Sequence, residues 1–187
     1  MNECIKALYG IVLLASCMFL VSGCTGDTLG EVIDQATADE LSRLSGYDTV
    51  NASTVKDRES LVAFVQKGRT HIEEYGFMFS RFEFKDNREW IEKDIYLYIY
   101  RMDGINVFHP IKPELEQQNL TDLTDANGVK IIQELMIVAD EGEGFVEYLW
   151  DNPDVQGDEV LGSVKVGYAE KFVIGGVPYF IGSGFYP

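Results

Sequence analysis

The chain has 187 residues, 46% of them hydrophobic, which is enough for one globular domain with additional segments. Its 31 acidic and 15 basic residues give a net charge of -16. A protein that binds nucleic acid needs a basic surface, so this charge balance excludes that class of partner. The cysteines are Cys4, Cys17 and Cys24, so we expect no disulfide or cysteine-based metal site in the rest of the chain.

The N-terminus has the layout of a secretory signal. Lys6 precedes the apolar run 7–21, which is shorter than the roughly 20 residues that span a bilayer. Small residues then lead into a cysteine, in the order Val21-Ser22-Gly23-Cys24. This pattern resembles the lipobox of prokaryotic lipoproteins, in which the cysteine becomes the lipidated first residue. The resemblance implies that Cys24 is lipidated and holds the protein at a membrane.

This interpretation divides the chain into three parts. We expect a lipoprotein signal peptide at 1–23, a tether with a short helix at 24–52, and the folded domain at 53–187. The alternative is an uncleaved segment that stays as an anchor, with the cysteine an incidental thiol. Either way, residues 25–187 are expected on the extracytoplasmic side of the cell membrane.

Two helices are predicted before the first strand. Residues 28–44 predict a short amphipathic helix. A long helix follows, with Ser53 or Thr54 as its N-cap and Gly76 at its end. Its apolar stripe, at intervals of three and four residues, is Leu61, Val65, Gly68, Ile72 and Tyr75. This length suits a helix that crosses one face of a sheet, whereas residues 77–89 are expected to be irregular.

The clearest strand pattern is a hairpin at 95–109. Apolar and tyrosine residues alternate, so Ile95, Leu97 and Ile99 face one side of a strand and Tyr96, Tyr98 and Tyr100 the other. Asp103-Gly104 suits a two-residue turn, and Pro110 ends the return strand because it has no N–H for the ladder. The hairpin thus has one aliphatic face and one face of phenol rings, which is the first candidate for a pocket wall.

The rest of the chain predicts a second helix and a three-stranded meander. The helix is expected at 129–139 and the strands at 145–150, 160–172 and 177–186. Segregated helices and an antiparallel sheet indicate an α+β domain with about five strands and the long helix on one face. The polar segment 112–138 would cover the other face, and a space beneath it would be a ligand site.

Several motifs follow one another along residues 54–187. They are Tyr96 with Asp103-Gly104 and His109-Pro110, Gly144-Phe-Val-Glu-Tyr-Leu-Trp150, Lys165 with Tyr168, and Ile181-Gly-Ser-Gly-Phe-Tyr186. Together they resemble a single Cache domain, the PAS-like extracytoplasmic sensor module of prokaryotic receptors. Gln117-Gln118-Asn119 departs from the family, which commonly has a glycine before the Asn or Asp, and this affects the expected path of the cover loop. The resemblance implies a small ligand, often a short carboxylate, between the sheet and its cover.

The candidate ligand-binding residues combine phenols, ring nitrogens and a cation. Phenols donate a hydrogen bond while their rings form the walls, and a cation strengthens the binding of a carboxylate. The predicted set is Tyr96, Tyr98, Tyr100, His109, Tyr148, Trp150, Lys165 and Tyr168. Each tyrosine has ordinary sheet packing as its alternative, and His109 either points into the pocket or fixes the strand end.

Metal binding and catalysis have weaker support in the sequence. His109 lacks partners at the spacing of a metal site, so we expect neither a metal nor another cofactor. Asp125 to Glu134 partly fits a calcium loop, but Leu123 would occupy the first ligand position, so a turn before a helix is favoured. Ser183 lies between two glycines without an evident activating base, so no enzymatic activity is expected.

The sequence therefore predicts a lipid-anchored extracytoplasmic sensor for a small organic acid. Receptors of the Cache family continue into a transmembrane helix and an output domain, whereas this sequence stops at Pro187. We accordingly expect a partner protein, such as a histidine kinase or a chemoreceptor, to carry the signal. The alternatives are an interaction module that docks on a membrane receptor without binding a ligand, and a small hydrolase. The identity of the ligand, the partner and the oligomeric state are left open.

Overall fold

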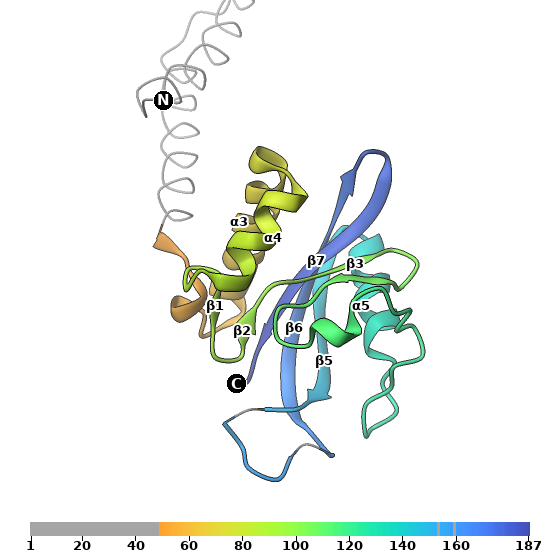
Figure 1. Cartoon of the computed structure of the whole chain (residues 1–187). Helices are drawn as coiled ribbons and strands as arrows, with labels where there is room; N and C mark the ends of the chain where they lie inside the picture. Colours follow the sequence, from red (N-terminus) through yellow and green to blue (C-terminus); the bar gives the residue numbers. More distant parts are fainter. Residues whose placement is uncertain (1–48, 153, 159) are drawn as a thin grey trace, which may run out of the picture. The chain divides into compact units, whose positions relative to one another are not determined.

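The computed structural model describes residues 49–187 except Pro153 and Glu159, and the predicted lipidation site and helix at 28–44 lie outside the described residues. A five-stranded antiparallel sheet forms the centre, with the strand order β4-β3-β7-β6-β5. The strands are β3 (Tyr98–Arg101), β4 (Asn106–Phe108), β5 (Glu143–Trp150), β6 (Ser163–Ile174) and β7 (Val177–Phe185). Helices α3 and α4 lie on one side of this sheet and α5 on the other (Figure 1). The predicted PAS-like α+β architecture is confirmed.

Helix α3 (Arg58–Tyr75) is the long helix expected from the apolar stripe. Its N-cap is Asp57, whose carboxylate accepts a hydrogen bond from the backbone N–H of Ser60 at 2.9 Å. The N-cap predicted at Ser53 or Thr54 is wrong, because these residues belong to the 3-10 turn η1 (Ala52–Thr54). The turn precedes a two-residue extended break, so the helix starts later and is shorter than expected.

Residues expected to be irregular form a second helix, α4 (Phe77–Asp86). Ser80 and Phe84 are buried, and the Phe84 ring lies 4.7 Å from that of Trp90. The outward side carries Met78, Phe79 and Phe82, which are 65%, 52% and 69% exposed. Aromatic residues on both sides of α4 hide its amphipathic period, which explains why the sequence pattern did not indicate a helix.

The alternation in the first hairpin separates two hydrophobic cores, as predicted. Leu97 and Ile99 belong to the core under α3, while the three tyrosines belong to the core under α5 (Ile131–Asp140). The first strand is interrupted, however. Residues Ile95–Tyr96 form β2, which pairs with β1 (Ile91–Glu92) in a separate two-stranded sheet. The tyrosine face nevertheless runs unbroken from β2 into β3.

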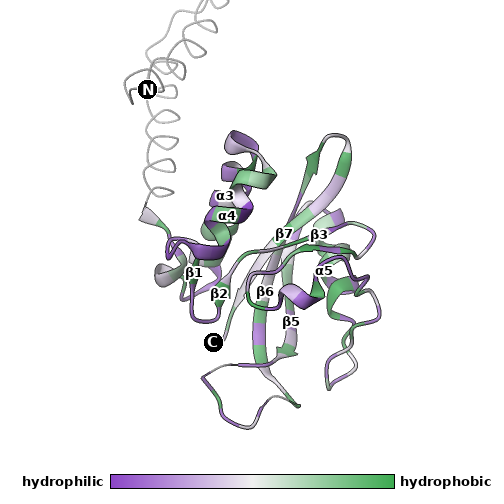
Figure 2. Ribbon diagram, viewed as in Figure 1, coloured by the Kyte–Doolittle hydropathy of each residue, from purple (hydrophilic) through white to green (hydrophobic). Residues whose placement is uncertain are grey.

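The last two strands form a long hairpin around Gly175-Gly176. Both glycines have positive φ, 57° and 82°, which the two central residues of such a turn require. Figure 2 shows hydrophobic residues along the strands of the sheet and hydrophilic residues in much of α3 and the loops. Among the described residues, no helix has the length and apolar character to cross a bilayer.

Candidate functional site

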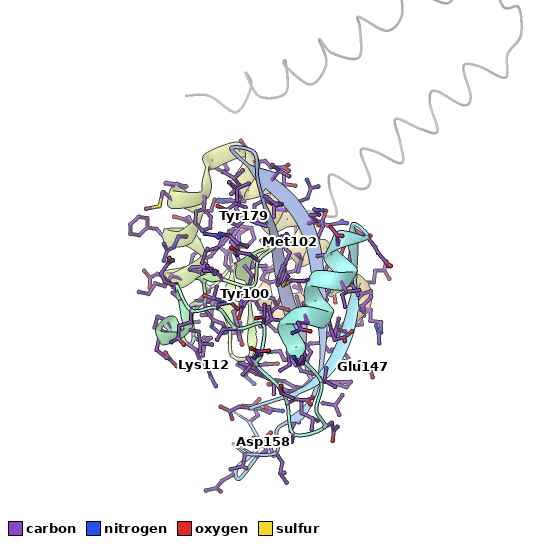
Figure 3. All side chains as sticks on the ribbon, turned by 90° about the vertical axis from the view of Figure 1, so that its right-hand side faces the viewer. Tyr100, Met102, Lys112, Glu147, Asp158 and Tyr179 are labelled. Atoms are coloured by element: carbon purple, nitrogen blue, oxygen red, sulfur yellow. The ribbon has the colours of Figure 1, made fainter. Side chains whose placement is uncertain are left out.

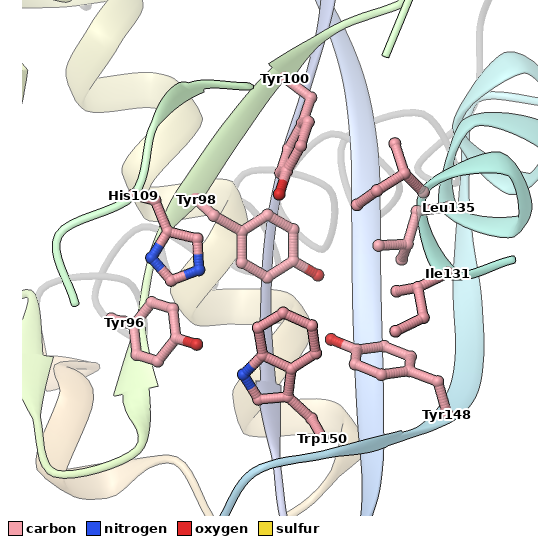
Figure 4. A pocket seen from close by; sticks show the side chains of 9 residues that line it. Tyr96, Tyr98, Tyr100, His109, Ile131, Leu135, Tyr148 and Trp150 are labelled. Atoms are coloured by element: carbon pink, nitrogen blue, oxygen red, sulfur yellow. The ribbon is translucent and has the colours of Figure 1, made fainter. Parts of the chain in front are cut away.

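A small cavity lies between the tyrosine face of the sheet and α5, where the sequence placed the ligand site (Figure 4). Its walls are Tyr96, Tyr98, Tyr100, His109, Ile131, Ile132, Leu135, Tyr148 and Trp150. The cavity volume is about 20 Å³, which is room for about one water molecule. Figure 3 shows the face on which α5 covers the sheet, with Tyr100 close to α5. The observed state is therefore closed.

Two glycines allow the tyrosine rings to lie close to the sheet. Tyr98 pairs with Gly182 across β3 and β7, and a Cβ atom at Gly182 would lie 2.5 Å from the Tyr98 ring. A Cβ atom at Gly167 would likewise lie 2.7 Å from the ring of Tyr148. The glycines of the last strands thus set the depth of the cavity, because they leave room for the rings.

The phenol groups around the cavity are in their protonated, hydrogen-bond-donating form at neutral pH. Burial raises the pKa of Tyr96 and of Tyr98 well above the ordinary value for tyrosine. Burial also raises the pKa of Tyr148 to about 12, although a hydrogen bond with Tyr98 acts in the opposite direction. These groups therefore carry hydroxyl hydrogens and no negative charge at neutral pH, and in the closed state the Tyr98 hydroxyl donates to the carbonyl of Ser183 at 3.4 Å.

His109 is a neutral donor at the cavity wall. Its side chain is buried, and its Nδ1 accepts a hydrogen bond from the backbone N–H of Lys112 at 3.0 Å, which places the ring proton on Nε2. Burial, followed by the charges of Lys165 and Lys112, lowers the pKa of His109 to about 3. The two predicted roles of His109 are thus combined, because one ring nitrogen holds the strand end and the ring also lines the cavity.

Lys165 lies on the same face of the sheet as the cavity but does not line it, and the ring of Tyr96 lies next to its ammonium group. Its Nζ is 4.7 Å from the centre of the Tyr96 ring and 4.9 Å from that of Tyr186. It donates one hydrogen bond, of 3.2 Å, to the carbonyl of Asp94. Burial lowers its pKa to about 8, although the charge of Asp94 acts in the opposite direction. Within the described residues Lys165 forms no ion pair. The ammonium is therefore a buried charge one ring away from the cavity.

Tyr168 lies on the opposite face of the sheet, so its predicted place in the pocket is wrong. Its hydroxyl donates to Glu143 at 2.7 Å, and its ring packs 5.0 Å from that of Phe145, in the core under α3. Lys165 and Tyr168 are three positions apart along one strand, and side chains an odd number of positions apart point to opposite faces. Only Lys165 can therefore serve the cavity.

The aliphatic wall of the cavity was not part of the predicted site. Ile131, Ile132 and Leu135 come from the first turns of α5 and close the cavity on the side of this helix. The sequence indicated that these residues pack, but their helical spacing alone does not distinguish a core contact from a ligand contact. Among the described residues, no cluster of three or more His, Cys, Asp or Glu side chains could hold a metal ion.

Ser183 has a structural contact in place of a catalytic one. It is buried in β7, and its hydroxyl donates to the carbonyl of Tyr96 at 2.7 Å. This hydrogen bond holds β2 against β7 and thereby fixes the first tyrosine of the cavity. The contact accounts for a serine at this position without a role as nucleophile.

Comparison with known proteins identifies relatives of this domain. A family model described as a Cache domain matches residues 83–187. A methyl-accepting chemotaxis protein from Vibrio parahaemolyticus is 31% identical, with a TM-score of 0.58, over 69% of this chain and 87% of that chain. A Cache chemosensory domain that recognises carboxylic acids has the same fold, at 19% identity and a TM-score of 0.51, over 82% of this chain and 96% of that one.

One curated relative is a much longer protein. The sensor histidine kinase MctS of Rhizobium johnstonii is 41% identical over 61 residues, which are 33% of this chain. The match spans only 13% of the length of the kinase. The similarity therefore concerns one part of that protein and does not extend to its kinase activity as a whole.

Proposed function

The chain belongs to the Cache domain family, and we propose that it is an extracytoplasmic sensor that binds a small organic acid. We further propose that Cys24 carries a lipid anchor and that a partner protein, such as a histidine kinase or a chemoreceptor, receives the signal. The similarity to a chemotaxis protein and to a sensor histidine kinase supports a role in signal transduction. The anchor rests on the lipobox-like sequence at 21–24.

The observation that carries this proposal is the convergence of hydrogen-bond donors on one cavity. Phenol, imidazole and indole groups from β2, β3, β5 and the segment after β4 surround it, and no Asp or Glu lines its walls. Behind Tyr96, Lys165 supplies a buried positive charge that forms no ion pair among the described residues and feels the charge of Asp94 only at longer range. A donor-rich site with a buried cation and no anion is complementary to a carboxylate.

The walls also indicate the shape of the ligand. The aliphatic side of the cavity, formed by Ile131, Ile132 and Leu135, faces the donor side, so a short apolar tail suits it. The lining contains no acidic group to pair with an ammonium, which disfavours amino acids. A short monocarboxylate such as acetate or propionate therefore fits best, in agreement with the carboxylic acids recognised by the Cache chemosensory domain of the same fold.

The closed cavity must expand before such a ligand binds. A volume of about 20 Å³ accommodates roughly one water molecule, whereas acetate has four non-hydrogen atoms. Trp150 is only partly buried and contacts Lys112, whose Nζ lies 5.0 Å from its ring. We infer that α5 or Trp150 moves outward on binding, so binding is accompanied by a conformational change that a partner can detect.

The first test is ligand-dependent thermal stability of residues 25–187. Acetate or propionate at 100 times its Kd is expected to stabilise the folded state by about 2.7 kcal/mol, because it binds only that state. Glycine and alanine serve as the amino-acid comparison and are expected to have no effect. Absence of stabilisation by every short carboxylate would contradict the proposal.

A matched pair of tyrosine variants locates the binding site. Tyr98→Phe removes one donor from the cavity wall and is expected to weaken acetate binding by about tenfold or more, the cost of a hydrogen bond to a charged group. Tyr168→Phe removes a hydroxyl from the opposite face and should leave the affinity unchanged. Isothermal titration of both variants makes the comparison. Equal effects of the two substitutions would place the ligand elsewhere.

A second candidate function is an interaction module, and the exposed side of α4 favours it. Met78, Phe79 and Phe82, with Tyr75 from the end of α3, expose large apolar side chains on adjoining helical turns. The small volume of the cavity is also what a module without a ligand would show. The two functions are compatible, because the exposed side of α4 and the cavity under α5 lie on opposite sides of the sheet (Figure 1).

Site-specific photocrosslinking in the native host tests the docking function. A photoreactive residue at Phe82 is expected to capture a membrane receptor that carries a kinase or chemoreceptor signalling module. The same residue at Val173, an equally exposed apolar position on β6, is the control and should capture none. Capture of the same receptor at both positions, or at neither, would argue against α4 as the docking surface.

A further inference from the structure

We propose that Asp125 is a positioning residue that latches a lid over the cavity, and that the ligand enters when this latch opens. The lid is defined as residues 123–135, which form a tight turn and the first half of α5. The inference rests on the proposed function in taking the cavity as the ligand site. The latch itself is argued from contacts on the lid and on strand β5.

The two carboxylate oxygens of Asp125 have separate tasks. Oδ1 accepts hydrogen bonds from the backbone N–H groups of Asn127 at 2.9 Å and Val129 at 2.8 Å, which close the turn of the lid. Oδ2 accepts a hydrogen bond of 2.8 Å from the backbone N–H of Leu149. One oxygen thus shapes the lid, and the other ties it to a strand 24 residues further along the chain.

Leu149, the residue that Asp125 holds, has a cavity-lining residue before it and another after it in the chain. Leu149 lies between Tyr148 and Trp150, which both line the cavity. Strand β5 is at the edge of the sheet, so a backbone N–H on its outer side has no strand to pair with. The bond from Asp125 therefore fixes the backbone that carries these two walls.

The other end of the lid carries the aliphatic wall. The backbone N–H of Ile131 donates to the carbonyl of Leu123 at 3.1 Å, which joins the turn directly to the start of α5. Movement of the turn away from β5 would consequently move Ile131 and Ile132 away from Tyr148. A single carboxylate thus links the two sides of the cavity that must separate for a ligand to enter.

The latch can open at low cost because it lies near the surface. Asp125 is partly exposed, so water can replace both partners of the bond to Leu149 when the lid moves. Burial raises the pKa of Asp125, but the backbone N–H groups of Leu149, Val129 and Asn127 together hold it below the ordinary value. The carboxylate is accordingly charged at neutral pH, and its hydrogen bonds are of the stronger, charge-assisted kind.

The substitution Asp125→Asn separates the latch from the turn. The amide oxygen can still accept from Asn127 and Val129, while the amide nitrogen then faces the N–H of Leu149, donor against donor. Asp125→Ser is a second variant, because its single oxygen can cap the turn but cannot also reach Leu149. Asp122→Asn is the control, since Asp122 lies in the adjoining segment. Its side chain pairs with Lys130 at 3.2 Å, and its backbone carbonyl accepts a hydrogen bond from the Thr124 hydroxyl.

The decisive measurement needs no ligand. Amide hydrogen exchange of Leu149 is expected to be about tenfold faster in Asp125→Asn, the loss expected for one hydrogen bond to a charged group. Exchange in the central strand β7 should stay as in the wild type. Acrylamide should also quench Trp150 more strongly, and Trp90 is too deeply buried to contribute. Unchanged exchange at Leu149 in a folded variant would overturn the latch.

A kinetic measurement with acetate connects the latch to binding. Because the latch must open before a ligand can enter, its loss should raise the association rate constant of acetate about tenfold. Rate constants equal to those of Asp122→Asn would overturn the inference. If acetate and propionate fail to bind the wild type, the proposed function fails, and hydrogen exchange still decides whether Asp125 latches the lid.

Discussion

Lys165→Met is expected to stabilise the folded domain by up to about 3 kcal/mol at pH 7 while abolishing the binding of acetate. Lys165 is 2% exposed, and its ammonium donates a single hydrogen bond, to the carbonyl of Asp94. The charge of Asp94 offsets only part of the cost of burying this ammonium, and methionine fills a similar volume without charge. Stability and ligand binding should therefore change in opposite directions.

The stabilisation expected from Lys165→Met depends on pH. Burial lowers the pKa of Lys165 from about 10.5 to about 8 in the folded state, so the unfolded chain binds the proton more tightly. Stability associated with Lys165 is present above pH 10.5, is lost as the pH falls towards 8, and stays low below that. Urea unfolding of wild type and variant should consequently show a gap at pH 7 that closes by about pH 10.5.

The matched control for this substitution lies on the same strand. Lys171→Met removes a partly exposed lysine of β6 that pairs with Asp140 at 2.6 Å. It should change stability by less than about 1 kcal/mol and leave acetate binding intact. Loss of stability in Lys165→Met, or undiminished binding of acetate, would show that the buried charge serves the fold and not the ligand.

His109→Asn is expected to remove a large part of the loss of stability at acidic pH. The pKa of His109 falls from about 6.5 in an unfolded chain to about 3 in the fold, chiefly because the ring is buried. Between these values the unfolded state binds one more proton, so folding free energy is lost at up to about 1.4 kcal/mol per pH unit. The contribution is complete above pH 6.5 and is lost progressively as the pH falls to about 3.

Asparagine is the informative substitute, because its side-chain oxygen can accept the hydrogen bond that Lys112 donates to Nδ1. The variant should be less stable than the wild type at pH 7, through lost packing against Tyr96, yet its stability should fall less steeply on acidification. Urea unfolding from pH 7 to pH 4 measures both slopes. His71→Asn is the control, since His71 is only partly buried and lies outside the cavity. Parallel slopes for wild type and His109→Asn would contradict the prediction.

The predicted site shows where sequence patterns are sufficient. Alternation at 95–101 assigned the tyrosines to one face, and the structure has them together under α5. The same rule of alternation separates Lys165 from Tyr168, because residues three positions apart in a strand point to opposite faces. Alternation along β6 therefore assigns Tyr168 to the face opposite Lys165, where the structure has it.

Other features depend on contacts between distant segments. The start of α3 at Asp57 required knowledge of the preceding turn, and α4 forms because Phe84 packs on Trp90 and Phe108, away from its neighbours in sequence. The latch from Asp125 to Leu149 likewise joins residues with no common motif. Propensity and periodicity describe neighbours along the chain and contain no information on such pairs.

The sequence by itself determined the acidic character, the presence of α3, α5 and the five strands of the central sheet, the two faces of the first hairpin and the Cache family resemblance. These follow from composition and from short-range periodicity, which each segment carries independently of the rest. Only the tertiary structure decided that the cavity has room for only about one water molecule and that His109 is neutral. It also decided that Lys165 donates to the carbonyl of Asp94 and forms no ion pair within the described residues. Cavity volume and protonation depend on how tightly separate segments pack and exclude water, and that is a property of the assembled domain.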